Sequence, residues 1–129
     1  MKHILVIDDN TEIRQVLKEM LEMESYQVSM AEDGAQALTM CEDTTFDLII
    51  TDICMPGKSG LEVIEELRKR SAGQKIVAIS GGPGTANAGG WTIYDEMLDT
   101  AGRSGADKTL AKPFDRAAIL ETISELIPG

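Results

Sequence analysis

Five polar residues stand directly after short apolar runs of this 129-residue chain, and their types suit phosphoryl chemistry. Asp8 and Asp9 follow the first apolar run, Asp52 the third, Ser80 the fourth and Lys112 the fifth. In an open parallel sheet, ligands bind beyond the carboxyl ends of the strands, so we expect all five residues at one rim. Taken singly, each residue is explained by a helix cap, a turn or a solvated charge. Their joint placement after four different runs favours a functional site.

The three carboxylates of this set predict a divalent metal site. Asp8, Asp9 and Asp52 would repel one another at a separation of a few ångströms, and a hard cation removes that repulsion. Mg²⁺ takes one or two protein carboxylates, keeps several waters and accepts phosphate oxygens, so we predict Mg²⁺, with Mn²⁺ able to substitute. Zinc is disfavoured because the only histidine, His3, lies at the other end of the first run.

With a metal held by two carboxylates, the third can attack phosphorus. We predict Asp52 as the nucleophile because it follows a central strand, and its attack gives an aspartyl phosphate by covalent catalysis. The phosphoryl oxygens then need neutralising, and the candidates are the metal, the ammonium of Lys112 and the hydroxyl of Ser80.

The apolar runs alternate with stretches of helical period, which predicts βαβ units around a parallel sheet. The predicted fold class is therefore α/β, a doubly wound five-stranded parallel sheet with helices on both faces. The continuous run in the third strand predicts a central position, and the weaker alternation of the second predicts an edge. The predicted strands are Ile4–Ile7, Tyr26–Ala31, Phe46–Thr51, Ile76–Ile79 and Thr109–Ala111.

Helix starts are marked by capping residues and by apolar residues at helical spacing. Asn10 is the predicted cap of the first helix and Asp115 of the last, and Asp33-Gly34 introduces the second. Gly60 precedes the third helix. The first helix carries the clearest single apolar stripe, formed by Ile13, Val16, Leu17, Met20 and Leu21.

Composition and charge limit the class of protein. A chain that is 43% hydrophobic and 26% charged is expected to form one domain over residues 1–129, with no output domain. The formal charge of −10 disfavours nucleic acid and anionic membranes as partners. Cys41 and Cys54 form no CxxC pair, so free thiols in a reducing cytosol are expected. We predict a cytoplasmic protein, since no apolar run approaches the ~20 residues that span a bilayer.

The chain resembles the receiver domains of response regulators in bacterial two-component signalling. The resemblance rests on motifs that occur in the family's order and at compatible spacings along the whole chain. They are Val6-Ile7-Asp8-Asp9-Asn10, Asp52-Ile53-Cys54-Met55-Pro56-Gly57 with Gly60, Ser80, and Lys112-Pro113-Phe114. The resemblance implies the flavodoxin-like strand order 2-1-3-4-5.

The resemblance also implies a function. Asp52 would accept a phosphoryl group from a histidine kinase or a phosphotransfer protein, with Ser80 and Lys112 contacting that group. The chain would act as a signalling switch rather than an enzyme, promoting only its own phosphorylation and dephosphorylation. The signal would pass by protein–protein interaction to a downstream protein that the sequence does not identify.

The resemblance implies a particular set of metal ligands. Asp9, Asp52 and the backbone carbonyl of Cys54 would bind Mg²⁺, and Asp8 would assist through water.

Two other classes of protein with a parallel sheet fit this sequence less well. A phosphohydrolase with an aspartyl-phosphate intermediate needs an acid where Cys54 stands, and a flavin domain needs a neutral phosphate loop where the acidic segment 8–12 stands. A pseudo-receiver is disfavoured because every acceptor-site residue is present.

Two regions depart from the family pattern. The aromatic residue common three positions before the lysine is Thr109 here, which leaves the usual aromatic readout open. The interval from Ser80 to Lys112 is 32 residues, and its excess falls in Gly81–Gly90, where five of ten residues are glycine. This glycine-rich segment is either a tolerated surface insertion or an element that presents Trp91 and Tyr94 to a partner.

Overall fold

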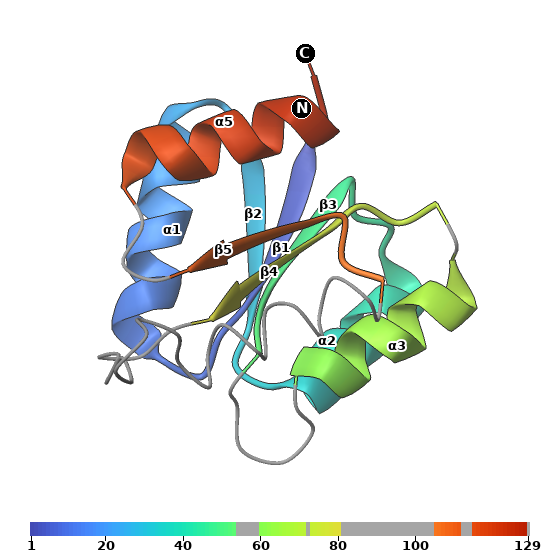
Figure 1. The fold of residues 1–129 in the computed structure, drawn as a ribbon. Helices are drawn as coiled ribbons and strands as arrows, with labels where there is room; N and C mark the ends of the chain where they lie inside the picture. The colour runs from blue at the N-terminus through green and yellow to red at the C-terminus, as the bar shows by residue number, and fades with distance from the viewer. Residues whose placement is uncertain (54–59, 72, 81–104, 112–114, 129) are drawn as a thin grey trace, which may run out of the picture.

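The structure is a computed structural model that describes residues 1–53, 60–71, 73–80, 105–111 and 115–128. It contains a five-stranded parallel sheet in the order β2-β1-β3-β4-β5 (Figure 1). The predicted α/β class and flavodoxin-like order are confirmed. The strands are β1 (His3–Ile7), β2 (Gln27–Ala31), β3 (Leu48–Asp52), β4 (Ile76–Ser80) and β5 (Lys108–Ala111). The described helices are α1 (Thr11–Met23), α2 (Gly34–Asp43), α3 (Gly60–Arg70) and α5 (Arg116–Leu126).

The strands lie within two residues of their predicted bounds, and the main correction concerns β3. Phe46 and Asp47 precede this strand instead of opening it. Asp47 joins the start of β1, because its amide donates to the carbonyl of His3 at 2.8 Å. At the other end, the pairing of Asp52 with Ile79 carries β3 one residue further than predicted. Asp52 is therefore the last residue of a central strand.

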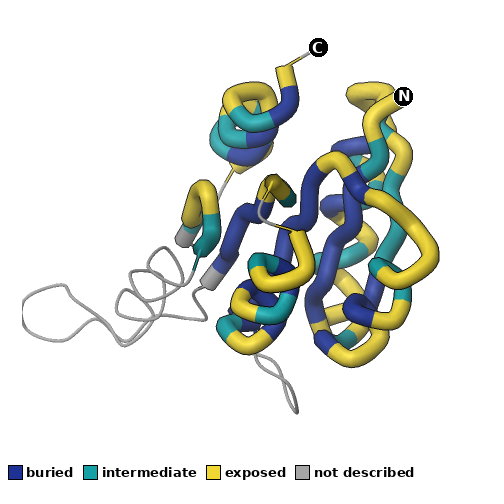
Figure 2. Tube along the Cα trace, turned by 90° about the vertical axis from the view of Figure 1, so that its right-hand side faces the viewer, coloured by how far each residue is buried: buried dark blue, intermediate teal, exposed yellow. Residues whose placement is uncertain are grey.

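The core has two layers, one on each face of the sheet. Side chains alternate along a strand, so Leu5 and Ile7 face one layer while Ile4 and Val6 face the other. Helices α2 and α3 cover the first layer, and α1 and α5 cover the second (Figure 1). Figure 2 shows β1, β3 and β4 as the buried middle of the molecule, with exposed residues on the outer faces of the helices.

Helix α1 buries less of its predicted stripe than expected. Leu17 and Leu21 are fully buried, but Val16 is 55% exposed. Val16 lies about 100° around the helix from Leu17, because successive residues are spaced at 3.6 per turn. The helix packs on its Leu17–Leu21 side, and this rotation leaves Val16 in solvent.

The predicted helix caps are confirmed. The Asn10 side chain accepts from the amide of Ile13 at 3.1 Å, and the Asp115 side chain accepts from the amide of Ala118 at 2.7 Å. Each such cap contributes about 1 kcal/mol. Among the helices that the structure describes, none has the length and apolar character required to cross a bilayer.

Candidate metal centre

Three predicted carboxylates converge at the carboxyl end of the sheet. One oxygen from each of Asp8, Asp9 and Asp52 lies within 4.8 Å of the other two. Asp8 is 2% exposed and Asp52 is 7% exposed, whereas Asp9 is exposed. Two members of the cluster are therefore buried, and the third is reachable from solvent.

Strand register explains why Asp8 and Asp52 meet. Ile7 of β1 pairs with Thr51 of β3, so the next residue on each strand lies beside its counterpart. Asp8 has the same parity as Val6, whose side chain belongs to the core layer under α1 and α5. Asp52 has the parity of Ile50, which belongs to that layer too. Both carboxylates therefore emerge on one face, where α1 begins.

The main chain around the cluster continues the sheet beyond the strand ends. The amide of Asp8 donates to the carbonyl of Ala31 at 3.2 Å, and the amide of Ile53 donates to the carbonyl of Ile79 at 3.0 Å. These bonds extend the ladders on both sides of the site. They place the acids on backbone that is held by its neighbours rather than on a free loop.

Gly60 brings the start of α3 against the end of β3. Its amide donates to the carbonyl of Ile53 at 2.9 Å. A Cβ added at Gly60 would lie 2.1 Å from the carbonyl oxygen of Asp52, a distance that no side chain tolerates. Sequence reasoning marked Gly60 as the end of a loop and part of a motif. The close approach itself depends on how α3 packs, and nothing local signals it.

The turn between β1 and α1 has a polar framework of its own. The amide of Asn10 donates to one carboxylate oxygen of Asp8 at 2.9 Å. The guanidinium of Arg14 donates to the carbonyl of Asp8 at 2.6 Å and to the hydroxyl of Thr11 at 3.2 Å. Sequence reasoning missed Arg14, because an arginine in the first turn of a helix carries no distinctive signal.

The remaining predicted site residues are only partly placed. Ser80 is the last residue of β4, and it pairs with Ala111 of β5. Its side chain, together with Lys112, the carbonyl of Cys54 and the glycine-rich segment Gly81–Gly90, lies outside the described residues. The roles assigned to them stay predictions.

Thr109, which stands where the family commonly has an aromatic residue, is described. It is exposed on β5, an edge strand, where it pairs with Ala78. Trp91 and Tyr94, whose presentation to a partner is one of the two alternatives for the glycine-rich segment, lie outside the described residues.

The donor set suits a hard divalent cation. Carboxylate oxygens are the ligands that Mg²⁺ prefers, and it uses one or two of them while keeping several waters. The exposure of Asp9 gives water access to this member of the cluster. The three oxygens are close enough that one ion could contact or polarise all of them.

Comparison with known proteins gives a consistent result. Residues 4–124 match the family model of the response regulator receiver domain. The transcriptional regulatory protein CpxR of Klebsiella pneumoniae is 33% identical over 127 residues, which are 98% of this chain and 50% of CpxR. The chain thus spans about half the length of that relative. The chemotaxis protein CheY of Halobacterium salinarum is 30% identical over 126 residues, which are 98% of this chain and 97% of CheY.

The fold comparison agrees with the sequence comparison. The crystal structure of the response regulator TrrA from Thermotoga maritima, in complex with Mg²⁺-BeF, superposes with a TM-score of 0.82. It is 37% identical, and the match covers 98% of this chain and all of TrrA, 100%.

Proposed function

The chain belongs to the response regulator receiver domain family, and from that premise we propose that Asp52 is its phosphoacceptor and Mg²⁺ its metal ion. Receiver domains of two-component response regulators serve phosphorylation-dependent signalling. The observation that carries the proposal is the convergence of Asp8, Asp9 and Asp52 within 4.8 Å. The TrrA structure, which is a complex with Mg²⁺-BeF, supports the same chemistry by relationship.

Asp52 is suited to act as the nucleophile. It ends a central strand, and a nearly buried carboxylate is weakly solvated, which makes its oxygen a better nucleophile. In the transfer, a bond forms between a carboxylate oxygen and phosphorus while the bond from phosphorus to the donor's imidazole nitrogen breaks. The imidazole leaves with the electron pair of that bond. The product is an acyl phosphate on Asp52.

The other site residues are assigned around this step. Asp9, Asp52 and the carbonyl of Cys54 are the proposed Mg²⁺ ligands, with Asp8 assisting through water. When bound, Mg²⁺ supplies positive charge that neutralises phosphoryl oxygens. Further neutralisation of the phosphoryl oxygens is assigned, as part of the proposal, to the ammonium of Lys112 and to the hydroxyl of Ser80.

The partners follow from this chemistry. We expect a histidine kinase or a phosphotransfer protein to donate the phosphoryl group, and a separate downstream protein to bind the phosphorylated surface. Turnover of phosphate esters is not expected, because Cys54 occupies the position where phosphohydrolases with an aspartyl-phosphate intermediate need an acid. Measurable hydrolysis of a generic phosphate ester by the purified chain would favour the hydrolase instead.

The test is phosphorylation by a small-molecule donor. Purified chain is incubated with acetyl phosphate and Mg²⁺, and intact mass is measured. We expect one phosphoryl group on the wild type, none on Asp52→Asn, and none on the wild type with excess EDTA. Asp47→Asn is the matched control. Asp47 is an exposed aspartate that directly precedes β3, so it lies at the end of the strand opposite to Asp52. Equal phosphorylation of Asp52→Asn and the wild type would overturn the assignment.

A further inference from the structure

We propose that Arg14 is a positioning residue for the metal centre. Its guanidinium holds the main chain between β1 and α1, and thereby presets the carboxylates of Asp8 and Asp9 for Mg²⁺. The inference rests on the proposed function, because it concerns the same site. It adds a residue outside the acidic cluster and assigns it a measurable effect.

The contacts of Arg14 span the whole turn. One guanidinium nitrogen donates to the carbonyl of Asp8 at 2.6 Å, and another donates to the hydroxyl of Thr11 at 3.2 Å. The amide of Arg14 donates to the carbonyl of Asn10 at 3.1 Å. A single side chain therefore ties Asp8, the residue that follows β1, to Thr11, the first residue of α1. A planar guanidinium is well suited to this task because its donors have fixed relative directions.

Asp8 is held at three of its atoms. Its amide donates to the carbonyl of Ala31 at 3.2 Å, its carbonyl accepts from Arg14, and one carboxylate oxygen accepts from the amide of Asn10 at 2.9 Å. Asn10 is itself fixed as the cap of α1 through its bond from Ile13. The turn is thus a connected network, and Arg14 contributes charged donors to it from the first turn of α1.

Asp9 depends on this network more than Asp8 does. Within the described part of the chain, the Asp9 side chain makes no hydrogen bond or ion pair. Its direction is therefore set by the main chain on either side, at Asp8 and Asn10. If that main chain loosens, Mg²⁺ must order it on binding, and the ordering entropy subtracts from the affinity.

The positioning effect of Arg14 and the effect of its charge predict opposite changes in Mg²⁺ affinity when Arg14 is removed. A cation near the site opposes Mg²⁺ electrostatically, so a charge effect alone means that removing Arg14 tightens metal binding. The bonds of Arg14 go to a carbonyl and a hydroxyl, and among the described residues it forms no ion pair with the three carboxylates. This geometry favours the positioning effect, and we expect removal to weaken binding.

The experiment compares Mg²⁺ affinity by calorimetry for the full chain and for Arg14→Met, which keeps the apolar stem. Loss of an outer residue that orients metal ligands typically lowers metal affinity by 10–100-fold, and we expect about tenfold here. Arg14→Lys keeps the charge but not the planar fork, and we expect it to bind Mg²⁺ more weakly than the wild type. It also carries the test if Arg14→Met does not fold.

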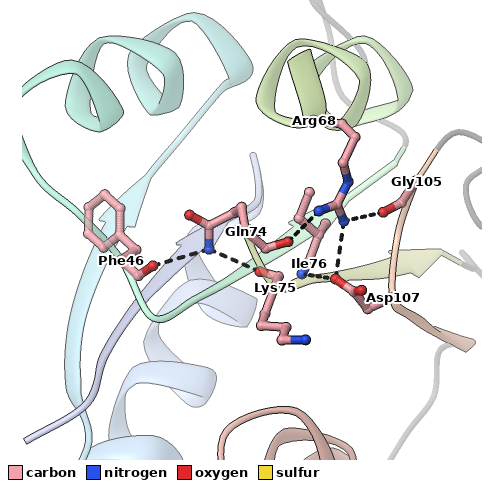
Figure 3. A network of polar contacts seen from close by, with 7 residues as sticks. All are labelled: Phe46, Arg68, Gln74, Lys75, Ile76, Gly105 and Asp107. Carbon is pink, nitrogen blue, oxygen red and sulfur yellow. Dashed lines mark hydrogen bonds and ion pairs between the residues drawn. The ribbon is translucent and has the colours of Figure 1, made fainter. Parts of the chain in front are cut away.

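Arg68→Met is the matched control for a merely structural effect. Arg68 donates to the carbonyl of Gln74 at 2.7 Å, at the opposite end of the sheet (Figure 3). Its loss is expected to lower the thermal midpoint equally with and without Mg²⁺, with unchanged Mg²⁺ affinity. For Arg14→Met we expect the increase in thermal midpoint on addition of Mg²⁺ to shrink.

The outcomes separate this inference from the proposed function. Asp9→Asn must weaken Mg²⁺ binding if the ion occupies the acidic cluster, and failure of that result, or of Mg²⁺ binding by the wild type, overturns both proposals. If Asp9→Asn weakens binding while Arg14→Met binds Mg²⁺ as tightly as the wild type or more tightly, only the role of Arg14 is overturned. Wild-type affinity in Arg14→Lys overturns it as well, because the planar fork of donors would then not be needed to hold the turn.

Discussion

The arrangement of charged side chains differs between the two ends of the sheet. At the carboxyl end, Asp8, Asp9 and Asp52 turn like charges toward one another within 4.8 Å. At the amino end, a carboxylate and a guanidinium face each other, since Arg68 lies 3.1 Å from Asp107. The same fold therefore gathers three carboxylates at one edge and joins groups of opposite charge at the other.

The pair at the amino end also satisfies main-chain groups. The Asp107 carboxylate accepts from the amide of Ile76 at 2.8 Å, and Arg68 donates to the carbonyls of Gln74 and Gly105 (Figure 3). Gly105 has φ +126°, a backbone conformation that favours glycine, and an added Cβ would also lie 3.1 Å from the Nε of Arg68. The network joins the end of α3 to the starts of β4 and β5.

This contrast separates stability from function. Charged groups that are paired and bonded to the main chain stabilise a fold, whereas like charges held close together destabilise it. Acids that repel one another are retained where they serve a ligand, at some cost in stability. We therefore expect substitutions at the amino end to lower stability, and substitution of the exposed Asp9 to raise it while weakening metal binding.

The largest expected effect tests the rigidity of the acidic end. In Gly60→Ala the new methyl group meets the carbonyl of Asp52 at 2.1 Å, and only movement of α3 or β3 can relieve the clash. We expect a loss of about 3 kcal/mol in the free energy of unfolding, measured by urea denaturation. Gly73→Ala is the control, because nothing lies within 4 Å of its added Cβ. Equal losses in both variants would contradict the close packing.

The next effect tests the amino-end network. Asp107→Ala leaves the amide of Ile76 and the guanidinium of Arg68 without the carboxylate that both contact. Hydrogen bonds to charged groups contribute about 2 kcal/mol, so we expect a loss of that size by urea denaturation. Asp43→Ala, at the exposed end of α2, is expected to change stability by less than about 0.5 kcal/mol.

A smaller effect of opposite sign tests the acidic end. Asp9→Asn removes one of three neighbouring negative charges, so we expect the metal-free chain to gain about 0.5 kcal/mol, a value reduced by solvent screening at this exposed residue. Added salt should shrink the gain. With saturating Mg²⁺ the order should reverse, because the wild type gains more binding free energy. A metal-free variant less stable than the wild type would break the comparison.

The smallest effect concerns an exposed ion pair between β5 and α5. A hydrogen bond and the charge of Glu125, 2.8 Å from the Lys108 ammonium, raise the pKa of Lys108. A raised pKa stabilises the fold at pH values below the ordinary lysine pKa of about 10.4, and this contribution is lost as pH rises through the raised value. NMR titration should give a lower Lys108 pKa in Glu125→Gln. An unchanged pKa would show that the pair does not persist in solution.

Local pattern was sufficient to predict much of the fold. Apolar runs placed all five strands to within two residues, and side-chain chemistry identified the caps Asn10 and Asp115. The acids of the site were predictable because parallel strands end at one edge, so residues after different strands must gather there. These features depend on residues close together in the chain or on a general rule of sheet topology.

Contacts between distant segments decided the remainder. The pairing of Asp52 with Ile79 sets where β3 ends, and the rotation of α1 against the sheet leaves Val16 exposed. The partners of Arg14 and the approach of Gly60 to β3 likewise depend on how a helix end meets a strand end. Such distances depend on register and packing across the whole core, and no short window of sequence encodes them.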